Sequence, residues 1–225
     1  MTNYVIDFDS TIISCESLDE LAAIALHDRT DRAVALKKLQ DLTNLGMAGK
    51  IAFDESLVRR LELFAPTDEH IQAVVAALSD RITPSFWQNR AWLQQNSGRI
   101  YVISGGFEEC IIPIVTKLGL LPQHVFANTF VRDEQGVING HDTSRYLSRA
   151  GGKIAQVNAL ALEGLVIAIG DGYTDYEIRQ SGQANNFWYF AENIERATVM
   201  EKADRVLYSF NEVIEYERMG LLQTA

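Results

Sequence analysis

Cysteine is scarce in this sequence, since Cys15 and Cys110 are the only two among 225 residues. Their separation matches no metal-binding motif, which argues against a thiolate zinc site and against a fold held by several disulfides. Basic residues are also outnumbered: 20 lysines and arginines face 30 acidic residues, for a formal net charge of −10. A chain this acidic is not expected to bind nucleic acid or an anionic membrane surface.

Long apolar runs are missing as well. No stretch approaches the ~18 residues that a membrane-spanning helix needs. The first residues lack the basic start of a secretory signal, and Asp7 and Asp9 interrupt them. We therefore expect a cytoplasmic protein with reduced thiols. The 225 residues suffice for one α/β domain or for one domain plus an insertion, and the 47% hydrophobic content suffices for a sizeable core.

A helical block is predicted directly after a first strand at residues 4–6. Apolar residues recur there at helical spacing in segments 16–26, 31–45, 53–63 and 67–78, with no strand pattern between them. Strands and helices then alternate, which is typical of a mainly parallel sheet. The predicted strands are 99–103, 125–131, 165–169, 187–190 and 205–207, a hairpin turn lies at 133–136, and the predicted helices are 84–95, 107–118, 153–162, 194–202 and 211–219.

Polar side chains follow three of the predicted strands. Asp7 and Asp9 follow the first strand, and Ser104 and Asp171 follow two later ones. Parallel strands bring their carboxyl ends to one edge of a sheet. Two carboxylates so close together need a cation or a shared proton, and carboxylates with a hydroxyl suit Mg²⁺. The alternative is a solvated turn in which the acids cap the next helix.

Two glycine pairs mark further candidates. Ser104-Gly105-Gly106 precedes a predicted helix and offers a hydroxyl and backbone N–H groups to an anion, although a plain Gly-Gly turn is the alternative. Lys153 follows a second Gly-Gly pair, and a surface lysine is its ordinary interpretation. A cation there would offset the repulsion between an aspartate and a phosphate, roughly 4 kcal/mol per charge pair at intermediate dielectric. Motifs typical of nucleotide binding are missing.

The ordered motifs resemble those of the haloacid-dehalogenase-like hydrolases over about residues 4–210. The residues that carry the resemblance are Asp7-Phe8-Asp9-Ser10-Thr11, Ser104-Gly105-Gly106, Lys153 and Gly170-Asp171-Gly172-Tyr173-Thr174-Asp175. Within that superfamily the chain is similar to the phosphoserine phosphatases, on Glu16, Asp19-Glu20 and the segment 46–60. The resemblance implies a Rossmann-like core, residues 1–13 and 80–225, with helices on both faces of the sheet, and a small inserted helical cap, residues 14–79.

The resemblance also implies a Mg²⁺-dependent phosphatase of serine biosynthesis that acts through an aspartyl-phosphate. Asp7 would be the nucleophile, and Asp9 would be the general acid and then the general base. The other implied roles are Mg²⁺ binding by Asp7, Asp171 and the main-chain carbonyl of Asp9, phosphoryl binding by Ser104, Gly105 and Lys153, and support of the site by Thr11 and Asp175.

Substrate selection would fall to the cap. By resemblance, Arg60 would pair with the carboxylate of phosphoserine and Glu16 would receive its ammonium group. Met47 and Phe53 would form an apolar wall that excludes water. The alternative for Arg60 and Glu16 is a pair of surface charges on amphipathic helices.

Thr174 and Tyr173 depart from the pattern, because many phosphoserine phosphatases have Asn and a small residue there. Thr174 would lie in the substrate site, so other functions stay open. They are a phosphatase for another small phosphorylated metabolite, a phosphotransferase to an alcohol such as homoserine, and a non-catalytic anion-binding protein. The intact set of Asp7, Asp9, Lys153 and Asp171 argues against the last. Asp9, the acid that phosphate esters need, disfavours a dehalogenase.

Overall fold

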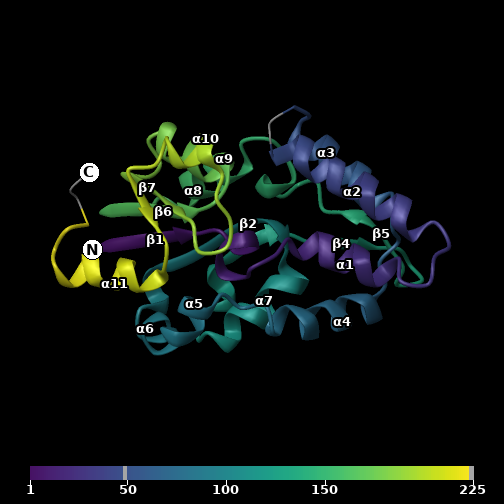
Figure 1. Ribbon diagram of the computed structural model, residues 1–225, viewed down its shortest axis with the longest axis horizontal. Helices are drawn as coiled ribbons and strands as arrows, with labels where there is room; N and C mark the ends of the chain where they lie inside the picture. Colours follow the sequence, from purple (N-terminus) through teal and green to yellow (C-terminus); the bar gives the residue numbers. More distant parts are fainter. Residues whose placement is uncertain (48–49, 223–225) are drawn as a thin grey trace.

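A six-stranded parallel sheet forms the centre of the computed structural model, which describes residues 1–47 and 50–222 without the side chains of Met47 and Phe53. The strands lie in the order β3-β2-β1-β6-β7-β8 (Figure 1). Their bounds are β1 Thr2–Ile6, β2 Ile100–Phe107, β3 Val125–Asn128, β6 Leu165–Gly170, β7 Asn186–Phe190 and β8 Arg205–Leu207. The predicted α/β class with a mainly parallel sheet is confirmed.

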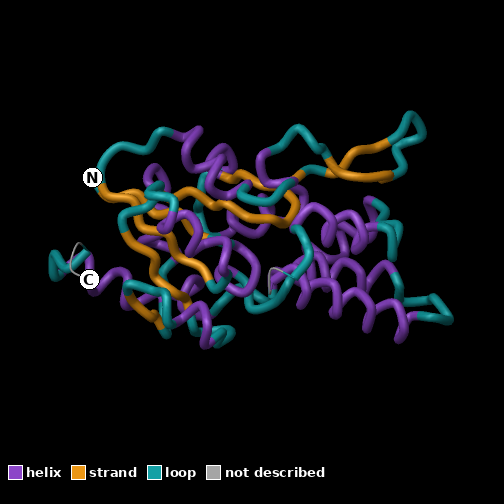
Figure 2. Tube along the Cα trace, turned by 90° about the horizontal axis from the view of Figure 1, so that it is seen from above, coloured by secondary structure: helices purple, strands orange, loops and turns teal. Residues whose placement is uncertain are grey.

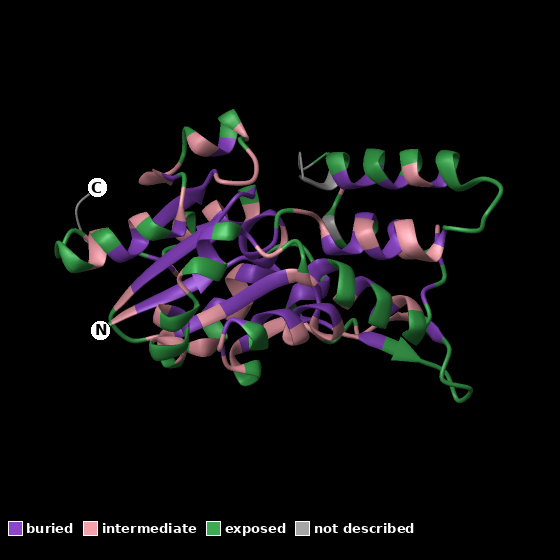
Figure 3. Ribbon diagram, turned by 60° about the horizontal axis from the view of Figure 1, so that its bottom comes forward, coloured by how far each residue is buried: buried purple, intermediate pink, exposed green. Residues whose placement is uncertain are grey.

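Helices cover both faces of this sheet. Tyr4 and Ile6 of β1 pack into one apolar cluster, and Val5 between them packs into the other. Burial on both faces explains why the strands are continuous apolar runs, and Figure 3 shows them buried between the helices. One face carries α5 Pro84–Gln88, α6 Arg90–Gln95, α7 Glu108–Lys117 and α11 Phe210–Arg218, and the other carries α8 Gly152–Leu160, α9 Tyr173–Gln180 and α10 Ala197–Met200.

Among the described residues, four more α-helices lie between β1 and α5 along the chain. They match the predicted helical segments and are α1 Ser17–Ala25, α2 Arg32–Met47, α3 Phe53–Leu61 and α4 Asp68–Ser79. They gather at one end of the molecule, near a hairpin of β4 Phe130–Arg132 and β5 Ile138–His141 (Figure 2). Across the described part of the chain, no helix combines the length and apolarity that a membrane crossing requires.

The strand predicted at 125–131 is wrong in its extent. It divides into β3, which belongs to the sheet, and β4, which pairs antiparallel with β5. The buried Asn128 ends β3, because its side-chain amide donates to the carbonyls of Gly105, at 2.9 Å, and Leu147, at 3.2 Å. These bonds tie the end of β3 to β2 and to the approach of α8, and the chain turns away into the hairpin.

Two helix predictions are also wrong in extent. The segment 84–95 breaks into α5 and α6 at Asn89, whose side-chain amide donates to the carbonyl of Ser85. The segment 194–202 reduces to α10, because the backbone of Arg196 is extended. The helix α9, which begins directly after Gly172, was not predicted. Such breaks depend on side-chain partners that helical periodicity does not encode.

Candidate active site

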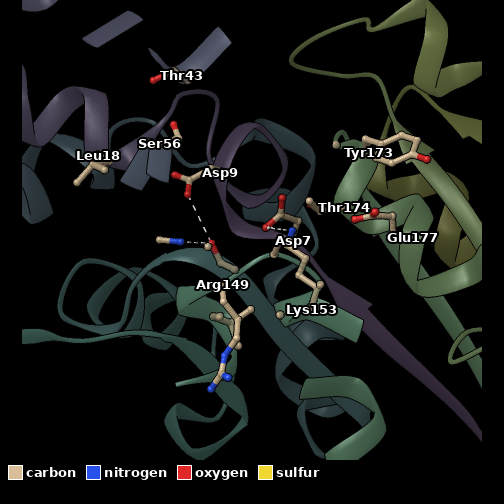
Figure 4. A pocket seen from close by; sticks show the side chains of 18 of the residues that line it. Asp7, Asp9, Leu18, Thr43, Ser56, Arg149, Lys153, Tyr173, Thr174 and Glu177 are labelled. Carbon is tan, nitrogen blue, oxygen red and sulfur yellow. Dashed lines mark hydrogen bonds and ion pairs between the residues drawn. The ribbon is translucent and has the colours of Figure 1, made fainter. Parts of the chain in front are cut away.

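A cavity of about 380 Å³ opens at the carboxyl edge of β2, β1 and β6 (Figure 4). Asp7 directly follows β1, Ser104 lies in β2 and Asp171 directly follows β6, and these strands are neighbours. The sheet order thus brings the three motifs together. The sequence-predicted residues that line the cavity are Asp7, Asp9, Glu16, Arg60, Ser104, Gly105, Lys153, Asp171 and Thr174.

Lys153 lies between two carboxylates in the wall of this cavity. Its Nζ atom is 2.9 Å from Oδ1 of Asp7 and 2.7 Å from Oδ1 of Asp175. Burial lowers the pKa of this ammonium, but the two carboxylates outweigh burial and leave the pKa above its usual value. Gly152 makes the placement possible, because a Cβ atom there would overlap the carbonyl of Tyr146. Lys153 is therefore a fixed cation beside Asp7.

Three carboxylates form a group that fits a metal ion. Asp7, Asp171 and Asp175 each offer an oxygen within 4.8 Å of the others. Burial, and then the charge of Asp7, raise the pKa of Asp171, so a cation among these groups would be stabilising. All donors in the group are carboxylate oxygens, which suit a hard ion such as Mg²⁺. Asp9 is predicted to contribute its main-chain carbonyl, and its carboxylate bonds to Ser17 and Ser104 instead of joining this group.

The carboxylate of Asp9 is held between α1 and β2. Its Oδ1 accepts a hydrogen bond from the backbone N–H of Ser17, at 2.6 Å, and its Oδ2 accepts one from the hydroxyl of Ser104, at 3.5 Å. Burial, and then the charge of Asp7, raise the pKa of Asp9 to about 6. A carboxyl group with such a pKa can both give and take a proton near neutral pH.

Asp171 is oriented by two side chains. The hydroxyl of Thr11 donates to its Oδ1 at 3.4 Å, and Nε of Arg196 donates to its Oδ2 at 3.0 Å. Sequence reasoning named Thr11 but missed Arg196, which it placed inside a helix. Residue type and spacing did not indicate this contact, because the pattern of residues 194–202 favours a longer helix.

Glu16 and Arg60 are not surface charges, so that alternative is wrong. The side chain of Arg60, on α3, is 10% exposed, and its Nη2 lies 3.3 Å from Oδ1 of Asp19. Its buried Nε has no hydrogen-bond partner among the described residues. Glu16 Oε1 accepts from the hydroxyl of Ser10 at 2.8 Å and lies 3.9 Å from Nη2 of Arg196. Burial, with the charges of Asp9 and Asp171, raises the pKa of Glu16 to about 8.

The glycine pair after Ser104 does not lie at a helix N-terminus as predicted. β2 continues through Gly105 and Gly106, and α7 begins at Glu108. The backbone N–H of Gly106 donates to the hydroxyl of Ser104, at 3.0 Å. Ser104 and Gly105 nevertheless line the cavity, because the strand itself carries them there.

The first turn of α9 forms a further part of the cavity wall, since Tyr173 and Thr174 both line the cavity. Tyr173 is 42% exposed at its rim. Met47 and Phe53 lie in α2 and α3, and their side chains lie outside what the structure describes. The predicted apolar wall of those two residues stays a prediction.

A family model and several known proteins match this chain. Residues 4–178 match the model of the haloacid dehalogenase-like hydrolases. The chain is 31% identical over 212 residues to human phosphoserine phosphatase, covering 92% of this chain and 89% of that protein. It is 32% identical over 211 residues to the chloroplastic phosphoserine phosphatase of Arabidopsis thaliana, covering 92% and 69%. A phosphoserine phosphohydrolase-like protein from Francisella tularensis superposes with a TM-score of 0.84 at 32% identity, covering 96% of this chain and 99% of the other.

Proposed function

Because the chain belongs to the haloacid dehalogenase-like hydrolases and is a phosphoric monoester hydrolase, we propose that it converts O-phospho-L-serine to L-serine and phosphate. The observation that carries the proposal is the buried Arg60, which lines the cavity together with Glu16 and Asp7 and whose Nε has no hydrogen-bond partner among the described residues. A substrate carboxylate would supply the missing acceptor. A substrate ammonium beside Glu16 would favour its charged form and lower its raised pKa.

Asp7 attacks phosphorus in the proposed reaction and forms an aspartyl-phosphate, while the oxygen of serine leaves. Lys153 reduces the repulsion between the carboxylate and the phosphoryl oxygens, because its ammonium already lies 2.9 Å from Asp7. Asp9 protonates the departing serine oxygen and then takes a proton from the water that hydrolyses the intermediate. Ser104, Gly105 and Thr174, which line the cavity, would contact the substrate.

The cluster of carboxylates described above fits Mg²⁺. We assign the binding of Mg²⁺ to Asp7, Asp171 and the main-chain carbonyl of Asp9. The chemistry that bound Mg²⁺ supplies is neutralisation of charge on the phosphoryl oxygens. Asp175 supports the site by fixing Lys153 and accepting the backbone N–H of Gly172, at 3.1 Å. Thr11 orients Asp171 through its hydroxyl.

Removal of Mg²⁺ with EDTA is expected to lower phosphatase activity by about 10³-fold, since electrostatic stabilisation by a metal is worth several kcal/mol. Added Mg²⁺ is expected to raise the Tm of the wild-type protein. The rise should be smaller in Asp171→Asn but unchanged in Asp41→Asn, an exposed aspartate on α2. Full activity after exhaustive chelation would contradict the metal assignment.

We further propose that residues 14–79 form a cap that selects the substrate and that residues 1–13 and 80–225 form the catalytic core. The cap supplies Glu16 and Arg60 to the cavity, while Asp7 and Lys153 come from the core. Residues on two parts of the chain must therefore come together around one ligand. A cytoplasmic location and the absence of nucleic-acid and membrane partners stay predictions from composition.

Arg60→Ala is expected to raise KM for phosphoserine by about 100-fold, because a hydrogen-bonded charge contributes about 1.5–3 kcal/mol. KM for p-nitrophenyl phosphate, which has no carboxylate, should change little. Arg59→Ala is the matched control, since Arg59 immediately precedes Arg60 on α3 but pairs with Glu55 on the surface. Steady-state kinetics on both esters decide, and an equal rise in both KM values would refute serine selection while leaving the phosphatase assignment intact.

Thr174 is the reason to test a second function. It lines the cavity where many phosphoserine phosphatases carry an asparagine, so a different small ester or an alcohol acceptor stays a candidate. A panel of phosphorylated metabolites identifies the ester. Addition of homoserine distinguishes the acceptors, because a phosphotransferase would form a new phosphate ester and a hydrolase would release inorganic phosphate.

A further inference from the structure

Asn193, in the loop after β7, joins parts of the chain that are far apart in sequence. Its side-chain nitrogen lies 3.1, 3.2 and 3.3 Å from the carbonyl oxygens of Ser10, Thr11 and Ile13. The same nitrogen lies 2.8 Å from the hydroxyl oxygen of Thr83. One amide group therefore holds the loop that follows Asp7 and the segment that enters α5.

These two segments are the entry from β1 into the helices α1–α4 and the exit from them into α5, and they also bond to each other. The hydroxyl of Thr83 donates to the carbonyl of Thr11 at 2.7 Å, and its backbone N–H donates to the carbonyl of Ile12 at 2.9 Å. The backbone N–H of Ser14 donates to the carbonyl of Arg81 at 2.9 Å. Asn193 thus fixes the junction at which the cap meets the core.

The loop held by Asn193 has an unfavourable backbone conformation. Ser10 has a φ of 54°, in the left-handed region that residues other than glycine rarely adopt. Such a conformation costs about 1–3 kcal/mol and persists only where the surroundings enforce it. Ser10 directly follows Asp9, so relaxation of this loop would displace both the proposed acid and the nucleophile Asp7.

We infer that Asn193 is a positioning residue for the phosphatase reaction, acting with Thr83 to hold the strained loop at Ser10. The inference rests on the proposed roles of Asp7 and Asp9. Asn193 and Thr83 are not among the described residues that line the cavity, so they act on the geometry of the reacting groups and not on substrate binding. Loss of either is expected to lower kcat and to leave KM nearly unchanged.

The test compares Asn193→Ala with Asn89→Ala. The side-chain amide of Asn89 also donates to a main-chain carbonyl, that of Ser85 on α5, and to a side chain, that of Asn211 on α11. Asn193→Ala is expected to lower kcat by about 100-fold on both phosphoserine and p-nitrophenyl phosphate, since a displacement of about 1 Å has that effect. Amide hydrogen exchange at Ile13, Ser14 and Thr83, measured by NMR, should accelerate about tenfold. Neither change is expected in Asn89→Ala.

Thr83 supplies an independent pair of variants. Thr83→Val removes the hydroxyl that accepts from Asn193 and should reproduce both effects, while Thr83→Ser retains the hydroxyl and should restore wild-type behaviour. A kcat for Asn193→Ala equal to that of Asn89→Ala, or equal exchange rates in the two, would overturn the inference. A wild-type protein inactive on both esters would contradict the proposed function instead, and the exchange rates alone would then decide whether Asn193 holds the junction.

Discussion

Asp7→Asn is expected to abolish turnover, with a loss of about 10⁴-fold or more, which is the scale seen when a nucleophile is removed. An amide oxygen has nearly the size of the carboxylate oxygen but does not attack phosphorus. The fold should persist, because Lys153 keeps its contact with Asp175 at 2.7 Å. Steady-state assays measure the loss, and mass spectrometry after acid quenching detects protein-bound phosphate, which the wild type should form and the variant should not.

Asp41→Asn is the control for this substitution, since Asp41 undergoes the same chemical change on the exposed side of α2. It should retain wild-type kcat and the phosphorylated intermediate. The circular dichroism spectrum and Tm of Asp7→Asn establish that it is folded. Near-wild-type turnover by folded Asp7→Asn would mean that another group attacks phosphorus.

The central sheet and the main catalytic candidates were predictable because both depend on local patterns. Strands buried on both faces are continuous apolar runs, and parallel pairing brings their carboxyl ends to one edge. Asp7 and Asp171 could therefore be placed together although they lie far apart in the sequence. Glu16 and Arg60 were different, because periodicity alone favoured surface charges, and only the family resemblance placed them in the substrate site.

Arg196 and Asn193 were not predictable, since their roles arise from the path of a loop. The pattern of residues 194–202 favoured a longer helix, yet the extended backbone at Arg196 lets its guanidinium reach Asp171. The contacts of Asn193 involve main-chain carbonyls, which every residue has. Contacts of this kind leave no trace in residue type or spacing, so they appear only when the chain is folded.

Asp9→Asn is expected to lower kcat on phosphoserine by about 10³-fold, because general acid catalysis contributes about 10²–10⁴-fold when the leaving group is an alkoxide. With p-nitrophenyl phosphate the outcome should differ. Nitrophenolate leaves without a proton, so the first step should proceed at nearly the wild-type rate. The second step still needs Asp9 as a base, so phosphorylated enzyme should accumulate. Stopped-flow absorbance should then show a burst of nitrophenolate close to the enzyme concentration, followed by slow turnover.

The two esters separate the roles of Asp9 because they differ in the basicity of the leaving oxygen. The side-chain amide that Asp9→Asn introduces can still accept, through its oxygen, from the backbone N–H of Ser17, which bonds to Oδ1 of Asp9 at 2.6 Å in the wild type. The position of the side chain should therefore be kept. Asp41→Asn again serves as the control and should show neither the loss nor the burst. An equal reduction of the first step for both esters would show that Asp9 does not protonate the leaving group, and that its substitution disturbs Asp7 instead.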